Sequence, residues 1–111
     1  MHKNMIDLIN RLVLWNSWKN PRDAQYIDYF ILEDSTISVR IHRRESDYEN
    51  GECANFVELI IKESERGFLS VCESSMGENG DRDLEIVEDN IPVFGVMQVI
   101  LEYNQELKEE N

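Results

Sequence analysis

Apolar residues recur at helical spacing near both ends of the chain. In residues 4–18 they fall on one broad face, at Met5, Leu8, Ile9, Leu12, Val13 and Trp15. Asn4 is the expected N-cap of this helix, and Pro21 prevents its continuation. Residues 92–108 show the same periodicity, with acidic and amide side chains on the opposite face. The spacing therefore predicts one amphipathic helix at each end.

Between these segments the apolar period changes from that of a helix to that of a strand. Ile37, Val39 and Ile41 alternate with polar residues, as in a strand with one buried face. The predicted strands are residues 26–32, 36–42, 56–63, 68–73 and, as an optional shorter fifth, 84–87. Long polar loops are expected at residues 43–55 and 74–83.

This order of elements predicts a single α+β domain spanning residues 1–111. It consists of an N-terminal helix, a four- or five-stranded antiparallel meander sheet and a C-terminal helix, with both helices packed on one face. Phe30, Phe56 and Phe68 fall on the opposite side of their strands. That side is therefore either partly covered or an exposed apolar patch, which would suit a homodimer.

Charge is distributed unevenly along the chain. The 111 residues carry a formal net charge of −12. Residues 1–44 contain seven Lys or Arg and five Asp or Glu, whereas residues 45–111 contain four and 18. An acidic half of this kind repels nucleic acid and anionic membranes and favours a basic protein partner. We therefore expect neither direct nucleic-acid binding nor membrane binding.

The sequence also bears on the compartment. Its apolar runs are far shorter than the ~18 residues of a membrane-spanning helix, and its first residues lack the apolar stretch of a secretory signal. Cys53 and Cys72 are then expected to be free thiols, because disulfides are rare in reducing compartments. The expected location is the cytoplasm.

Motifs for catalysis or cofactor binding are missing from the sequence. It has no glycine-rich phosphate loop and no GxSxG turn. His42 is expected to be a surface residue held neutral by two neighbouring arginines, and its spacing from Cys53 and Cys72 does not suit a metal. Residues 78–85 resemble a calcium loop in composition only, because the ligand order is absent and Arg82 interrupts it. We expect no enzyme activity, no metal and no cofactor.

Two runs of closely spaced carboxylates are the candidate partner-binding residues. The first comprises Glu45, Asp47, Glu49 and Glu52, with Tyr48 as an aromatic anchor. The second comprises Glu78, Asp81, Asp83, Glu85, Glu88 and Asp89. In an extended chain, spacings of two to three residues correspond to about 6–10 Å, comparable with successive phosphates of one nucleic-acid strand. The alternative interpretation is that these residues are simply solvated acidic loops.

In size, charge and helix–sheet–helix order, the chain resembles small acidic inhibitors carried by phages and mobile elements. These include nucleic-acid mimics that block defence nucleases, among them anti-CRISPR proteins. The resemblance and the acidic half together predict a non-enzymatic inhibitor that docks on a basic nucleic-acid-handling protein. The chain is also similar to immunity proteins that neutralise toxins, so an immunity or antitoxin-like protein is one alternative. A small self-associating regulatory module is the other.

Overall fold

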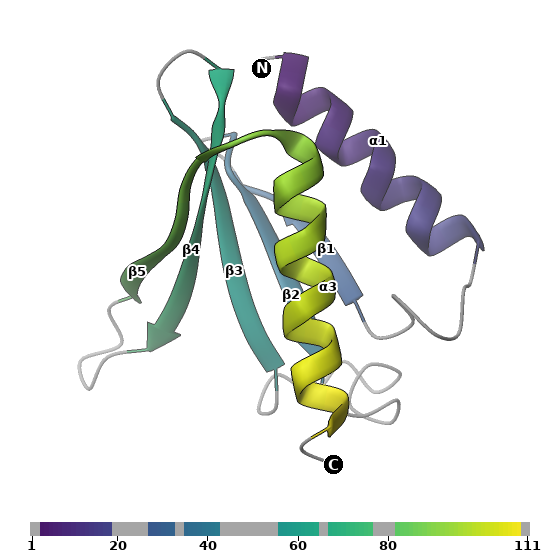
Figure 1. Cartoon of the computed structure of the whole chain (residues 1–111), viewed down its shortest axis with the longest axis vertical. Coiled ribbons are helices and arrows are strands. Elements are labelled where there is room, and N and C mark those ends of the chain that lie inside the picture. The colour runs from purple at the N-terminus through teal and green to yellow at the C-terminus, as the bar shows by residue number, and fades with distance from the viewer. Residues whose placement is uncertain are drawn as a thin grey trace.

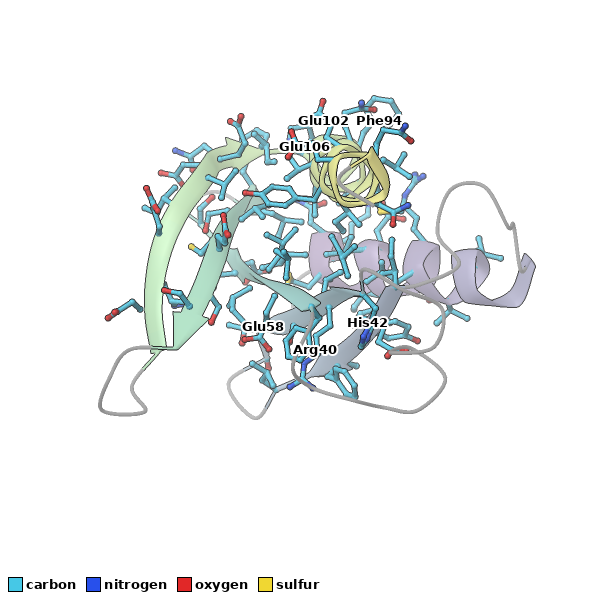
Figure 2. The ribbon with its side chains drawn as sticks, turned by 90° about the horizontal axis from the view of Figure 1, so that it is seen from below. Arg40, His42, Glu58, Phe94, Glu102 and Glu106 are labelled. Atoms are coloured by element: carbon cyan, nitrogen blue, oxygen red, sulfur yellow. The ribbon has the colours of Figure 1, made fainter. Side chains whose placement is uncertain are left out.

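The computed structural model describes residues 3–18, 27–32, 35–42, 56–64, 67–76 and 82–109. Its elements are α1 (Lys3–Trp18), β1 (Ile27–Ile31), β2 (Ile37–His42), β3 (Phe56–Glu63), β4 (Leu69–Met76), β5 (Arg82–Ile91) and α3 (Val93–Glu109). The five strands pair antiparallel in the order β1-β2-β3-β4-β5 (Figure 1). Both helices lie on one face of this sheet (Figure 2). The predicted α+β meander with two covering helices is therefore confirmed, with five strands.

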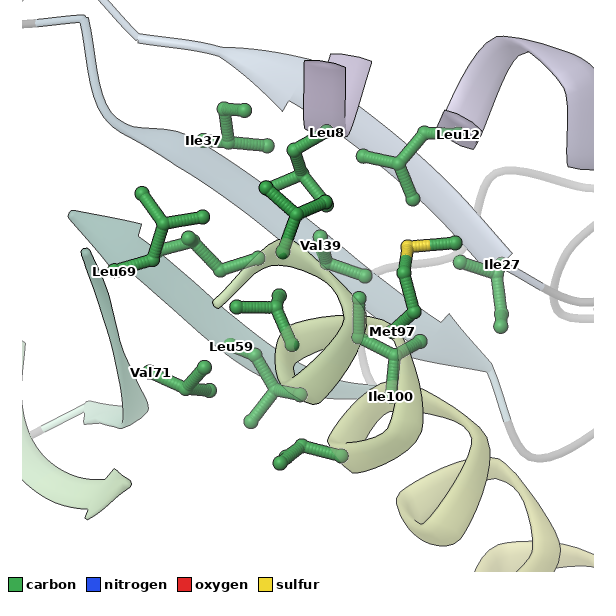
Figure 3. Close-up of a cluster of buried hydrophobic side chains, with 14 of the residues drawn as sticks. Leu8, Leu12, Ile27, Ile37, Val39, Leu59, Leu69, Val71, Met97 and Ile100 are labelled. Atoms are coloured by element: carbon green, nitrogen blue, oxygen red, sulfur yellow. The ribbon is translucent and has the colours of Figure 1, made fainter. Parts of the chain in front are cut away.

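The hydrophobic core lies between the sheet and the two helices (Figure 3). Alternate residues of the central strands, such as Val39 and Leu59, point to this face and are fully buried. Leu8 and Leu12 of α1 and Ile100 of α3 pack against them. The helical spacing of the apolar residues gives each helix one apolar stripe that faces the sheet. The face of the sheet that carries the helices is called the helix face below, and the opposite one the outer face.

The end of α3 nearest the sheet and the start of α1 are each fixed by a specific contact. A Cβ on Gly95 would lie 3.3 Å from Ile91 Cβ, so α3 begins close against the last residue of β5. The Asn4 side chain donates a hydrogen bond to the Gly67 carbonyl in the turn before β4. Asn4 thus lies within α1 and joins the helix to the sheet, although the sequence predicted it as an N-cap.

Two strands are longer than predicted. The sequence indicated a polar loop over residues 74–83, whereas β4 continues to Met76 and β5 starts at Arg82. The residues concerned, such as Ser74 and Asp83, have low strand propensity and were therefore interpreted as loop. Pairing of Ser74 with Leu84 and of Ser75 with Asp83 supplies the hydrogen-bonded ladder that overrides this preference. Part of the second acidic run is consequently a strand.

Candidate partner-binding surface

The second acidic run lies largely on β5, the last strand of the sheet. Asp83, Glu85, Glu88 and Asp89 are all exposed there. The spacing expected for an extended chain is present where β5 pairs regularly with β4, from Arg82 to Ile86. Asp83 and Glu85 are two residues apart on the same face of the strand, which corresponds to about 6.6 Å.

Seven of the predicted partner-binding residues fall outside the part of the chain that the structure describes. Those that lie outside the described residues are Glu45, Asp47, Tyr48, Glu49, Glu52, Glu78 and Asp81. The candidate surface that can be built from the structure therefore starts from β5 and its neighbours.

The register between β4 and β5 decides which side chains accompany the acids. Glu85 lies opposite Glu73, and Glu73 lies opposite the core residue Leu59, so both carboxylates are on the helix face. Leu84 and Ile86 alternate with them and point to the outer face. Two like charges directly opposite each other on neighbouring strands lower the stability of a sheet by about 0.2–1 kcal/mol. The fold keeps this Glu73–Glu85 pair in spite of that cost.

The helix α3 brings further carboxylates to the same side of the molecule. Glu102 and Glu106 are exposed on α3 and lie on the opposite side of the molecule from Arg40, His42 and Glu58 (Figure 2). The charges of Glu106 and Glu85 contribute to the raised pKa of Tyr103, after its burial and its contact with Glu73. We use the name acidic surface for Glu73, Asp83, Glu85, Glu106 and Tyr103. Sequence reasoning did not find Glu73, Glu106 or Tyr103, because they join β5 only through tertiary contacts.

Tyr103 connects α3 to the acidic surface through Glu73. Its hydroxyl donates a hydrogen bond to Glu73 Oε2 at 3.0 Å. Partial burial raises the pKa of Tyr103 to about 12, with further contributions from the Glu73 hydrogen bond and from the charges of Glu73, Glu106 and Glu85. The phenol therefore remains protonated at physiological pH and acts as a donor among carboxylates.

The carboxylates of the acidic surface have no cationic partner among the described residues. The described ion pairs that involve an arginine lie outside the acidic surface. Arg11 pairs with Asp7 on α1, and Arg40 pairs with Glu58 on the outer face. Glu73, Asp83, Glu85 and Glu106 are therefore not neutralised by a described lysine or arginine. Negative potential from such a group extends about 8–10 Å into solvent at physiological salt.

The outer face of the sheet carries a different arrangement, centred on Arg40. Its guanidinium carbon lies 4.7 Å from the Phe30 ring centroid and 4.9 Å from that of Phe56, so it is held between two aromatic rings. Arg40 Nε also donates to Glu58 Oε2 at 3.3 Å, and Ser38 Oγ donates to the same oxygen at 2.7 Å. This is a compact polar network on the strand face for which the sequence left open partial cover or an exposed apolar patch.

His42 belongs to the same outer-face network, and its predicted exposure is wrong. Only 5% of the His42 residue surface is exposed. Its Nε2 lies 3.1 Å from Asp28 Oδ2, and its ring centroid lies 5.7 Å from that of Phe56. The sequence predicts positively charged neighbours for His42, because two arginines follow it. The antiparallel pairing of β1 with β2 instead brings the Asp28 carboxylate beside the ring.

The three phenylalanines singled out in the sequence do not form one patch. Phe30 and Phe56 both contact the Arg40 guanidinium. Phe68 lies immediately before Leu69, the first residue of β4. Strands β1 and β4 are separated by two others, which corresponds to about 14 Å. Phe68 is exposed by itself, so a continuous Phe30–Phe56–Phe68 surface is not present.

Among the described residues, no three His, Cys, Asp or Glu side chains gather closely enough to hold a metal ion. Cys72 is a buried free thiol on the outer face, as the sequence predicted. Cys53 lies outside the described residues.

Comparison with known proteins does not identify a relative. No family model, no curated protein and no solved structure matches this chain. Within the described residues, neither helix has the length and apolar composition needed to cross a lipid bilayer.

Proposed function

We propose that this protein is a non-enzymatic inhibitor that docks through its acidic surface on a basic, nucleic-acid-handling protein and blocks the nucleic-acid site. The observation that carries the proposal is the pairing of Glu73 with Glu85 across β4 and β5, beside the hydrogen bond from Tyr103 to Glu73, without a described cation at these carboxylates. Their mutual repulsion disfavours the free protein, and a bound cationic partner would relieve it. Asp83 lies two residues before Glu85 on the same face of β5 and extends this surface along the regular part of the strand.

The geometry of β5 supports mimicry of a phosphate backbone. Asp83 and Glu85 project from one side of an extended strand at about the spacing of phosphates along a single nucleic-acid strand. The ladder with β4 fixes the backbone of this segment, so a groove of lysines and arginines would meet the two carboxylates without having to order the chain that carries them. The phenol of Tyr103 adds an aromatic ring with a hydrogen-bond donor, a combination enriched at protein interfaces.

The alternative of a module that self-associates through phenylalanines receives less support. Phe30 and Phe56 already contact the Arg40 guanidinium, and Phe68 lies apart from them. An immunity-type inhibitor of a basic toxin uses the same electrostatics, and the identity of the captured partner separates the two functions.

The test is competition between this protein and nucleic acid for one captured partner. A pull-down from host lysate at low salt identifies basic nucleic-acid-binding proteins, and a single-stranded oligonucleotide is then added to each purified complex. We expect the oligonucleotide to displace the inhibitor, and elevated salt to weaken the complex steeply.

Glu85→Lys and Asp7→Lys form a matched pair, because each raises the net charge by two and each replaces a surface acid. Asp7 lies on α1 and pairs with Arg11, away from the acidic surface. Loss of competition with Glu85→Lys but not with Asp7→Lys is the expected result. Equal binding by both variants, or binding unaffected by the oligonucleotide, would contradict the proposal.

A further inference from the structure

The outer edge of β5 is unpaired in the described structure. β5 is the last strand in the sheet order, and Figure 1 shows no described helix or strand beyond it. It is ten residues long, the longest of the described strands. An edge of this kind presents backbone N–H and C=O groups that can pair with a strand from another chain.

Only the first half of this edge is regular. From Arg82 to Ile86, β5 pairs residue by residue with Met76 to Cys72 of β4. Beyond Ile86 the register shifts twice between Cys72 and Leu69, and Asn90 has a positive φ of 52°. Irregularities of this type twist a strand edge and prevent further pairing. Arg82–Ile86 is therefore the segment of this edge that is regular enough to pair with another strand.

The two sides of this segment differ in chemistry. Asp83 and Glu85 point to the helix face, whereas Leu84 and Ile86 point to the outer face. Leu84 is 40% exposed and Ile86 is 63% exposed. Ile86 ends a row of cross-strand neighbours that continues through Cys72 and Ile60, both of which are buried. Because no described strand lies beyond β5, this apolar row ends at Ile86 among the described residues.

We propose that the Arg82–Ile86 edge of β5 binds an extended segment of a protein partner in which basic and apolar residues alternate. The added strand would place its basic side chains beside Asp83 and Glu85, and its apolar side chains beside Leu84 and Ile86. This inference rests on the proposed function and specifies how the acidic surface engages its basic partner. Backbone pairing supplies the affinity, and the alternation supplies the specificity.

A second copy of this chain does not fit the same edge. Antiparallel pairing of two β5 strands would bring Asp83 and Glu85 of one copy beside the same residues of the other. Opposed like charges destabilise such pairing, and inward or edge charges are a known protection against self-association. The charge of the edge therefore selects a basic strand.

The probe is a synthetic seven-residue peptide of alternating lysine and valine. Two control peptides have the same composition: one has a scrambled order, and the other is N-methylated at alternate valines so that it cannot form the backbone ladder. We expect the alternating peptide to bind, and both controls to bind at least about tenfold more weakly. Hydrogen exchange should show slowed amides within residues 82–86 when the alternating peptide is bound.

Ile86→Thr and Ile6→Thr are the matched variants of the protein. Both replace an exposed isoleucine by a residue of similar shape without changing charge, and Ile6 lies on α1. Ile86→Thr should weaken peptide binding by about two- to fivefold, and Ile6→Thr should leave it unchanged. Unchanged circular dichroism confirms that both variants remain folded.

The outcomes separate this inference from the proposed function. Equal affinity for the alternating, scrambled and N-methylated peptides, with no slowed exchange in residues 82–86, would overturn edge pairing. If Glu85→Lys still abolished partner competition in that case, the proposed function would stand alone. If none of the peptides binds, the charges of β5 only protect the edge from association, and the inference is wrong.

Discussion

The Tyr103 hydroxyl donates to Glu73 Oε2 at 3.0 Å, linking α3 to β4 across the acidic surface. This bond supplies a donor to a carboxylate that also faces Glu85 on the neighbouring strand. It therefore both fixes the position of α3 over the sheet and moderates the repulsion between two glutamates. Interface chemistry and structural stability depend here on the same pair of residues.

Replacing Tyr103 by phenylalanine should lower the free energy of unfolding near neutral pH by about 0.5–1.5 kcal/mol, because Glu73 loses a donor. Urea unfolding followed by circular dichroism measures this difference. Tyr29→Phe is the control, since Tyr29 also packs against the core. A larger loss for Tyr29→Phe than for Tyr103→Phe would contradict the assigned role.

The same tyrosine predicts a pH dependence. Its pKa is raised to about 12 in the folded protein, above the ordinary value of 10.0, so the native state holds the proton more tightly than the unfolded chain. The stabilisation is fully present below pH 10 and is lost as the pH rises from about 10 through about 12. Tyr103→Phe should lack this loss, which unfolding at a series of alkaline pH values would show. An identical decline in both proteins would contradict it.

Removing one charge from the opposed glutamates should stabilise the fold. Glu85→Gln removes the like-charge contact with Glu73, and the free energy of unfolding should rise by about 0.2–1 kcal/mol at low salt. Added sodium chloride should narrow the difference from the unmodified protein, because it screens the repulsion. Thermal unfolding at two salt concentrations measures both effects. A destabilised Glu85→Gln protein at low salt would refute the assignment.

The Arg40–Glu58 pair predicts a larger effect of the opposite sign. The Glu58 side chain is 8% exposed and that of Arg40 is 28% exposed. Arg40→Ala leaves a buried carboxylate without its cation, and the loss should lie near the lower end of about 3–5 kcal/mol because solvent still reaches Arg40.

Arg40→Lys keeps the charge but loses the planar stacking between Phe30 and Phe56. It should lose less stability than Arg40→Ala. The double variant Arg40→Met with Glu58→Leu should recover most of the loss, since no unpaired charge is left. If the double variant is as unstable as Arg40→Ala, packing and not charge pairing explains the effect.

Core and edge isoleucines should respond very differently to truncation. Ile61→Ala removes a fully buried side chain from the helix face and should cost about 2–5 kcal/mol. Ile86→Ala, on the open edge, should remain within about 0.5 kcal/mol of the unmodified protein. Chemical denaturation compares the two. A cost for Ile86→Ala similar to that for Ile61→Ala would show that the edge is covered in solution.

Local pattern was sufficient for most of the elements. The period of two in Ile37, Val39 and Ile41 identified β2 and its buried face, and the helical spacing of Leu8 and Leu12 identified the face of α1 that covers them. Both are properties of neighbouring residues on one element. Residues 74–76 and 82–83, which the sequence predicts as loop, are strand, because their polar composition resembles a loop until strand pairing is known.

The sequence by itself determined the two amphipathic helices, the alternating central strands, the order of elements and the acidic second half. It also placed Asp83 and Glu85 in a closely spaced run. Only the tertiary structure decided that Glu73, Glu106 and Tyr103 join them, that Asp28 faces His42, and that β5 forms an open edge. These relationships depend on the register of strands and on the packing of a helix over a sheet. Contacts between residues distant in sequence leave no periodic signal in the chain, so they had to be seen in the fold.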